Sequence, residues 1–221
     1  FSWWLQRLEH HFQWFDLVRI DHFRGLEAVW MIDSDCETAI DGHWEKTPGN
    51  RLLQVLQETM GSIPLVAEDL GVITPEVTAL RQQFKLPGMS ILQFAFDAFE
   101  DNPHKPANIT RDRIVYSGTH DNNTTVGWYQ SLAENEQKFV RETLGISPGK
   151  DIVDAIVESA MNSEAILSVF PLQDILKLGE EARMNIPGDV GDHWTWKFDW
   201  SQITTKLTTN LREVTLDANR C

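Results

Sequence analysis

Three short motifs each place a carboxylate at or just past the end of an apolar, strand-like run. A reaction at the anomeric carbon of a sugar uses one carboxylate that attacks the carbon and one carboxylic acid that protonates the leaving oxygen. A barrel of alternating strands and helices gathers such groups from distant parts of a sequence onto one rim. The motifs therefore indicate an enzyme that acts on glycosidic bonds. They are Arg-Ile-Asp-His-Phe-Arg-Gly at 19–25 with Asp21, Ala-Glu-Asp-Leu-Gly at 67–71 with Glu68, and Gly-Thr-His-Asp-Asn at 118–122 with Asp121.

Asp21 lies two residues after Arg19, so the two side chains project from the same face of a strand. A guanidinium beside a carboxylate favours the ionised carboxylate, which is the form that can attack a carbon atom. The alternative interpretation is a structural ion pair at a strand end. For an isolated Arg-x-Asp that alternative is the more common one.

Glu68 follows the apolar run Leu65-Val66-Ala67, which can withdraw its side chain from water. An apolar setting and a neighbouring negative charge, here Asp69, both favour a protonated carboxyl group. Such a group can donate a proton to a departing sugar oxygen. The alternative is a capping or solvated acid just after a strand.

Asp121, preceded by His120, can bind sugar hydroxyls and stabilise positive charge on the anomeric carbon. The alternative is a turn rich in Asp and Asn that caps a helix beginning near Thr124. A metal-dependent hydrolase is a further alternative, but barrel enzymes of that kind need several His ligands. Only His22 and His120 follow predicted strands, so we expect no metal and no other cofactor.

Apolar runs and helical spacing predict an alternating order of strands and helices. We expect loops between Asp21 and Leu52 and at 97–112. Strands are predicted at 17–20, 64–67, 90–94, 113–116 and 165–169, and helices at 2–15 (capped by Ser2), 52–60, 74–84, 124–132, 135–144, 151–162, 171–178 and 201–216.

A strand followed by a helix, repeated along the chain, predicts an α/β fold with a parallel sheet covered by helices. About five such units do not close an eight-stranded barrel, which needs about 250 residues. We therefore expect residues 1–221 to form one domain that lacks part of its sheet. Because the chain opens at Phe1 without a methionine, we also expect that its start is truncated.

The composition suits a globular protein with a neutral, hydroxyl-rich substrate. The formal net charge is −14, which disfavours nucleic acid or an anionic membrane as the main partner. Nine Trp and eleven Phe include rings that can stack on sugars, although most are expected in the core. Cys36 and Cys221 show no metal or disulfide spacing, which favours a reducing compartment. The sequence has no apolar run of roughly 18 residues that would span a membrane.

Beyond the three motifs, the sequence resembles the 4-α-glucanotransferases (amylomaltase or disproportionating enzyme) of glycoside hydrolase family 77, in the α-amylase superfamily. The resemblance covers essentially the whole chain. The segments that carry it are Ala67–Leu80, Leu86–Met89 with Gln93–Asp97, Thr119–Thr125, and Pro171–Asp174 with Glu181–Gly188.

The resemblance implies the C-terminal part of a TIM (β/α)8 barrel, with its last five strands. It also implies transfer of α-1,4-glucan segments between maltodextrin donors and acceptors, through a covalent glucosyl-enzyme and with retention of configuration. Asp21 matches the nucleophile, Glu68 the general acid/base and Asp121 the transition-state stabiliser. The first three strands, the inserted subdomains and their acceptor-side residues have no counterpart here.

Four further residues match sugar-contacting positions of the family. Arg19 and His120 correspond to residues that hold the nucleophile and the innermost donor sugar, and Asp69 and Asn185 to further glucan contacts. The family generally lacks the structural calcium of other α-amylases. Its members imply a cytoplasmic location or, in a plant, a plastid.

Two other functions stay open at this stage. In an α-amylase-type retaining hydrolase, water rather than a second glucan would intercept the intermediate. In a glucan-binding fragment, the missing strands would have removed part of the barrel and cleft. We expect this chain alone to be poorly stable and nearly inactive.

Overall fold

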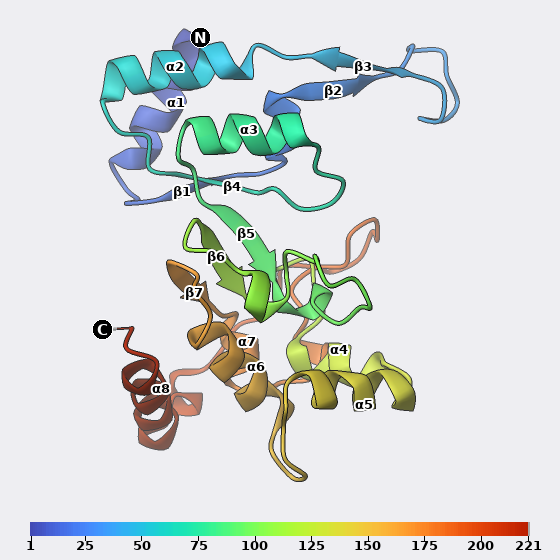
Figure 1. Cartoon of the computed structure of the whole chain (residues 1–221), viewed down its shortest axis with the longest axis vertical. Coiled ribbons are helices and arrows are strands. Elements are labelled where there is room, and N and C mark those ends of the chain that lie inside the picture. The colour runs from blue at the N-terminus through green and yellow to red at the C-terminus, as the bar shows by residue number, and fades with distance from the viewer. Residues whose placement is uncertain (221) are drawn as a thin grey trace. The chain divides into compact units, whose positions relative to one another are not determined.

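The computed structural model describes residues 1–220, so Cys221 lies outside the described residues. Contacts divide the chain into two compact units, one ending at Met89 and one beginning at Ser90, and each is described by itself. Figure 1 labels their helices and strands. The expectation of a single domain over 1–221 stays a prediction.

The first unit is built around two parallel strands. In β1 and β4, Val18 lies opposite Leu65 and Ile20 lies opposite Ala67, and the two strands run side by side in Figure 1. The strand β4 is buried along its whole length, as its apolar run predicts. The elements are α1 (Ser2–Phe12), β1 (Val18–Ile20), β2 (Ala28–Met31), β3 (His43–Lys46), α2 (Gly49–Met60), β4 (Leu65–Ala67) and α3 (Pro75–Gln83).

The core of the first unit lies between its helices and this strand pair. The helix α2 contributes three leucines at helical spacing, which form the apolar face of an amphipathic helix. Phe23 is fully buried in the same core, directly after the first motif. The buried side chains include Leu52, Leu53, Leu56, Leu65, Ala67, Val77, Leu80 and Leu86.

An antiparallel hairpin occupies part of the stretch between Asp21 and Leu52, so the expectation of a loop there was wrong. Trp30 of β2 lies opposite Trp44 of β3, and their ring centroids are 5.4 Å apart. The Arg24 guanidinium stacks 4.0 Å from the centre of the Trp44 ring and donates to the Val72 carbonyl. The strand β3 has no apolar run and is exposed throughout. Its cross-strand pairs with β2 therefore stabilise it.

The second unit contains a three-stranded sheet in the order β5-β6-β7. The strands β6 and β7 are parallel, with Ile114 opposite Leu167. The elements are β5 (Gly88–Ile91, which begins at the end of the first unit), β6 (Arg113–Tyr116), α4 (Thr125–Ser131), α5 (Glu134–Thr143), α6 (Ile152–Met161), β7 (Leu167–Val169), α7 (Leu172–Ile175) and α8 (Thr205–Asp217).

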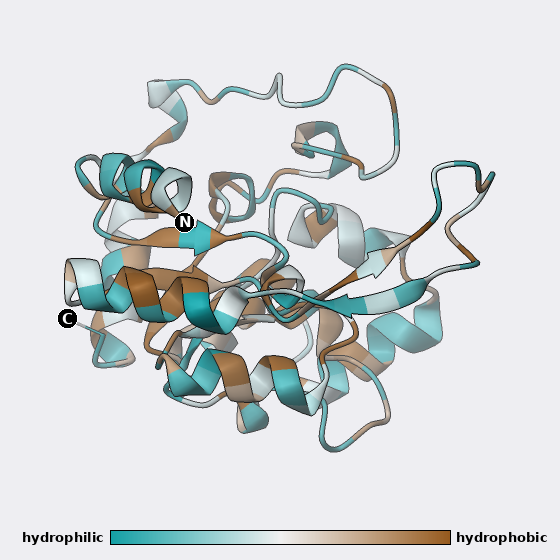
Figure 2. Cartoon of the chain, turned by 90° about the horizontal axis from the view of Figure 1, so that it is seen from above, coloured by the Kyte–Doolittle hydropathy of each residue, from teal (hydrophilic) through white to brown (hydrophobic). Residues whose placement is uncertain are grey.

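Helix α6 supplies much of the core in this unit. Its buried side chains pack with Leu92 and Val115, and Asp151 caps its first turn by accepting from two backbone N–H groups. Figure 2 shows helices that carry both apolar and polar segments. The buried residues of α6 are Ile152, Val153, Ala155, Ile156, Val157 and Ala160.

Several predicted boundaries shift. Residues Leu92–Phe94, predicted as strand, form a 3-10 turn after β5. The helix predicted to reach residue 178 ends at Ile175, and Lys177 then adopts a positive φ of 56°. The predicted terminal helix is divided into a 3-10 turn at Trp200–Gln202 and α8.

The helix predicted at 2–15 stops at Phe12, and Ser2 lies inside it without capping it. The parallel pairs nevertheless confirm a mixed α/β fold. No helix within residues 1–220 has the length and apolar character needed to cross a membrane.

Candidate active site

Asp21 directly follows β1, and 77% of its side chain is exposed. Arg19 Nη2 lies 3.0 Å from Asp21 Oδ1, as their spacing on one strand face predicts. Exposed ion pairs contribute about 0–1 kcal/mol to stability, so stability gives little reason for this pair. Most of the Asp21 carboxyl group stays accessible to a ligand beside Arg19.

Glu68 directly follows β4 and lies beside the end of β1. The Glu68 backbone N–H donates to the Ile20 carbonyl at 2.9 Å. Its carboxylate accepts two backbone N–H bonds, from His22 to Oε2 at 2.6 Å and from Leu70 to Oε1 at 3.1 Å. The half-buried side chain therefore bridges the loops that follow the two strands.

The register of β1 and β4 sets the distance between the backbones of Asp21 and Glu68. Because Ile20 is paired with Ala67, Asp21 and Glu68 are the next residues of two neighbouring strands. Neighbouring strands lie about 4.8 Å apart. A retaining enzyme needs its carboxyl groups about 5–5.5 Å apart, and an inverting one about 6.5–9.5 Å. The strand register therefore starts the two acids from neighbouring backbone positions, and the separation of their carboxyl groups depends on the direction of the two side chains.

His22, between Asp21 and the buried Phe23, has φ of 50° and ψ of 54°. This left-handed conformation is unfavourable for a residue with a Cβ atom and costs about 1–2 kcal/mol. Backbone strain of this kind clusters at functional sites. The strain here coincides with the N–H group that donates to Glu68.

Asp69 has a setting different from its neighbour. Only 3% of its side chain is exposed, and its Oδ2 lies 3.3 Å from Nε of the equally buried Arg81. Its Oδ1 accepts the Met89 backbone N–H at 2.8 Å. The resemblance assigns this carboxylate to a glucan contact, but in the structure it contacts Arg81 and the Met89 N–H inside the first unit. Its position favours a structural role.

In the second unit, Asp121 accepts a hydrogen bond from the Asn185 amide to Oδ1 at 2.7 Å. His120 Nε2 lies 3.4 Å from Asp121 Oδ2. The alternative of a helix cap is wrong, because the Thr124 hydroxyl caps α4 by accepting from the Gly127 N–H. His120, Asp121 and Asn185 are thus brought together, and Asn185 contacts the acid directly.

Two residues near Asp121 were missed by sequence reasoning. Arg183 donates from Nη2 to the Asp121 carbonyl at 2.9 Å and from Nε to the Asn185 carbonyl at 2.8 Å. The Trp194 ring is centred 5.0 Å from the His120 ring, and this tryptophan is 60% exposed. Arg183 lies in the 181–188 segment that carries the resemblance. Trp194 has no local signal, because its contact is tertiary.

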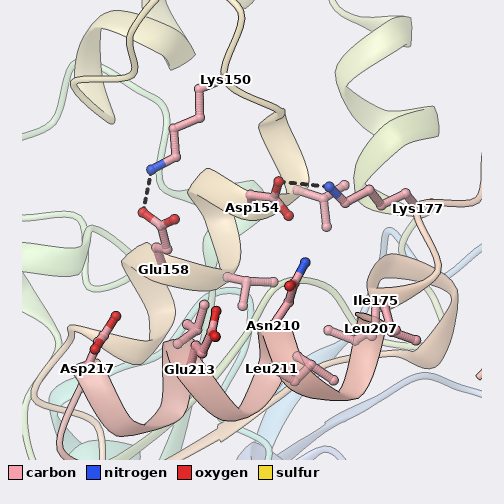
Figure 3. A pocket seen from close by; sticks show the side chains of 13 residues that line it. Lys150, Asp154, Glu158, Ile175, Lys177, Leu207, Asn210, Leu211, Glu213 and Asp217 are labelled. Carbon is pink, nitrogen blue, oxygen red and sulfur yellow. Dashed lines mark hydrogen bonds and ion pairs between the residues drawn. The ribbon is translucent and has the colours of Figure 1, made fainter. Parts of the chain in front are cut away.

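A separate groove of about 300 Å³ lies between α6 and α8, and Figure 3 shows its charged rim. Lys150 pairs with Glu158, and Lys177 lies 2.8 Å from Asp154. Burial opposes the charge on Lys177, but hydrogen bonds to Asp154 and Asp151 outweigh it and raise the pKa of Lys177 above its usual value. These lysines therefore already have acidic partners within the groove.

Within residues 1–220, no three His, Cys, Asp or Glu side chains gather in an arrangement that could hold a metal ion. In the first unit, Asp21 and Glu68 directly follow two paired parallel strands, and a pair of carboxyl groups is what glycosidic-bond chemistry uses.

Comparison with known proteins identifies the family. The family model for glycoside hydrolase family 77, 4-alpha-glucanotransferase, matches residues 1–204. The chain is 47% identical over 219 residues to the 4-alpha-glucanotransferase of Thermus thermophilus, covering 96% of this chain and 44% of that protein. It is 41% identical over 214 residues to the chloroplastic/amyloplastic 4-alpha-glucanotransferase of Solanum tuberosum, covering 97% of this chain and 37% of that protein.

A solved structure gives the same result. The amylomaltase from Streptococcus agalactiae, in complex with acarbose, matches 99% of this chain and 44% of its own length, with a TM-score of 0.94 and 31% identity. The chain therefore belongs to glycoside hydrolase family 77, the 4-alpha-glucanotransferases. It spans less than half the length of these relatives.

Proposed function

We propose that this chain belongs to a 4-α-glucanotransferase that moves α-1,4-glucan segments from a maltodextrin donor to a maltodextrin acceptor. The observation that carries the proposal is the pairing of β1 with β4, which starts Asp21 and Glu68 from neighbouring positions. Family membership supports the same activity. The related amylomaltase from Streptococcus agalactiae binds acarbose.

In the first step, an oxygen of the Asp21 carboxylate attacks the anomeric carbon of the donor. The bond from this carbon to the leaving glucan oxygen breaks, and Glu68 gives its proton to that oxygen. The leaving glucan departs, and the rest of the donor stays bound to Asp21 through its terminal glucosyl unit. Arg19, whose Nη2 lies 3.0 Å from Asp21 Oδ1, orients the attacking carboxylate through this ion pair.

In the second step, Glu68 removes the proton from the 4-hydroxyl of an acceptor glucan. The acceptor oxygen attacks the anomeric carbon, and the bond to Asp21 breaks. Two inversions restore the α configuration. The backbone donors of His22 and Leu70 keep the Glu68 carboxyl group at one place through both steps.

Asp121 serves as the stabiliser of positive charge on the anomeric carbon, and His120 binds the same sugar. Asn185, with Arg183, fixes the Asp121 side chain and carbonyl. Asn185 therefore acts in our proposal mainly through Asp121. We leave Asp69 out of the glucan contacts because its carboxylate is buried against Arg81.

The fold we propose is the C-terminal part of a (β/α)8 barrel over residues 1–221. The parallel pairs β1-β4 and β6-β7 and the order β5-β6-β7 support this proposal, since a TIM barrel consists of parallel strands with helices between them. The bacterial and chloroplastic relatives support a cytoplasmic location or, in a plant, a plastid.

The test is to incubate the complete protein with maltotriose and follow the products by chromatography. Transfer predicts glucose together with a ladder of glucans longer than maltotriose. Products limited to glucose and maltose would identify a hydrolase instead. The 221-residue chain tested in parallel should show almost none of either activity, and robust disproportionation by it would refute that expectation.

A further inference from the structure

A buried carboxylate joins both ends of the loop that carries Asp121. Asp174 of α7 is only 1% exposed. Its Oδ2 accepts from the Ser117 hydroxyl at 2.5 Å and from the Thr125 hydroxyl at 2.9 Å. Its Oδ1 accepts the Thr125 backbone N–H at 2.6 Å.

The two partners of Asp174 lie on either side of the third motif. Ser117 directly follows β6, and Thr125 is the first residue of α4. Residues 118–124 between them include His120 and Asp121. One side chain therefore fixes where this loop leaves the sheet and where it enters the helix.

The interior of the loop is also held by hydrogen bonds. Asn122 Oδ1 accepts from both the N–H and the hydroxyl of Thr119, each at 2.9 Å. The side-chain amide of Gln93 donates to the Asn123 carbonyl at 2.9 Å. A loop that is tied internally and at both ends moves as one piece, so a displacement at Asp174 is transmitted to Asp121.

We infer that Asp174 is a positioning residue for the reaction, which sets the place of Asp121 and His120 without touching the sugar. The inference rests on the proposed function. Three donors converge on one carboxylate, and only an acceptor without protons of its own accepts from all of them at once. In Asp174→Asn, an amide N–H group would face the two hydroxyls. Each hydroxyl could then turn and accept that N–H group, so asparagine would replace part of the lost contacts and alanine would replace none.

The test compares Asp174→Asn and Asp174→Ala in the complete protein, with disproportionation of maltotriose as the assay. Misplacing a catalytic group by about 1 Å can cost about 100-fold in rate. We expect kcat to fall roughly 10–100-fold, more for Asp174→Ala than for Asp174→Asn, while KM changes little. A wild-type kcat in both variants would overturn the inference.

A matched control separates positioning from general loss of stability. Asn102 is also buried, and it donates to the Phe94 carbonyl and to Asp97. Asn102→Ala should lower the melting temperature but leave kcat unchanged at temperatures where the protein is folded. An equal loss of kcat in Asn102→Ala and Asp174→Asn would overturn the inference.

Two further readouts make the result specific. In an Asp121→Asn background, Asp174→Asn should have little additional effect on kcat, because the group it positions is already lost. Hydrogen exchange at the Thr119 and Asn122 amides should be faster in Asp174→Asn than in the wild type, and unchanged exchange would contradict the inference without reference to activity. Absence of transfer in the wild type would instead overturn the proposed function.

Discussion

Two adjacent acids show how much the setting of a residue decides its role. Glu68 and Asp69 both follow β4, but the Glu68 carboxylate bridges two loops while that of Asp69 is enclosed with Arg81. Burying two charges is costly unless they are paired. The Asp69–Arg81 pair is therefore best understood as part of the first unit's core, and this assignment can be tested.

Replacing Asp69 with asparagine should destabilise the protein by about 3–5 kcal/mol, because the buried Arg81 loses its carboxylate. Denaturant unfolding measures this loss. KM for maltodextrin in the remaining folded enzyme should stay near the wild-type value. Asp16→Asn, a change at an exposed position, is the control and should alter stability by less than about 0.5 kcal/mol. A raised KM with unchanged stability would restore Asp69 as a glucan contact.

At the scale of elements, hydrogen bonds from loops fix the ends of strands. His104, in the loop between β5 and β6, accepts the Ile91 N–H through Nδ1 at 3.1 Å, and its ring is centred 5.5 Å from that of Phe94. Burial lowers the pKa of His104 from 6.5 to about 4. The charge of Arg113 acts in the same direction and that of Asp97 in the opposite one. Only the neutral ring can accept this hydrogen bond.

This histidine predicts a pH dependence of stability. Because the pKa of His104 is lower in the folded than in the unfolded state, the unfolded state binds more protons between pH 6.5 and about 4. Stability therefore falls as pH decreases through this window. Allowing for partial exposure, we expect about 2 kcal/mol to be lost.

The measurement is the free energy of unfolding at several pH values, for the wild type and for His104→Gln. Glutamine retains an acceptor but does not titrate, so its curve should fall less steeply between pH 6.5 and 4. The difference between the curves removes the contribution of other groups. Parallel curves would show that His104 does not titrate as proposed.

How far the elements could be predicted depended on burial. The strand at 113–116 was predicted with the bounds that the structure gives, and β4 within one residue, because β4 is apolar and buried throughout and the two central residues of β6, Ile114 and Val115, are apolar and buried. The hairpin was missed although β2 is apolar and begins with the buried Ala28, because its partner β3 is exposed throughout and is held by cross-strand contacts such as Trp30 with Trp44. Local sequence does not record such partners.

In the candidate site as well, some residues were predictable from local sequence and others were not. The order of strand and acid predicted that Asp21, Glu68 and Asp121 gather on one rim. Of this, the pairing of β1 with β4 places the backbones of Asp21 and Glu68 at neighbouring strand ends, and the convergence of all three acids stays a prediction. The contacts of Arg183, Trp194 and Asp174 depend on segments about 50 residues or more from their partners in the sequence. The local spacing of residues in the sequence does not predict such long-range contacts.

At the scale of the whole molecule, the chain is a family member that covers less than half of its relatives' length. Its net charge of −14 is consistent with a neutral polysaccharide as substrate. The proposed activity depends on one chemical claim, that Asp21 forms a covalent bond with the donor sugar. A retaining site makes this claim accessible to direct detection.

The most direct measurement is mass spectrometry of the complete protein carrying Glu68→Gln, after reaction with α-glucosyl fluoride. Fluoride leaves without a proton from Glu68, so the first step proceeds, whereas the second step lacks its base and the intermediate accumulates. We predict an added glucosyl unit on the peptide that contains Asp21, and no adduct when Asp21→Asn is introduced as well. An adduct on another residue, or none in a variant that still consumes the fluoride, would contradict the account.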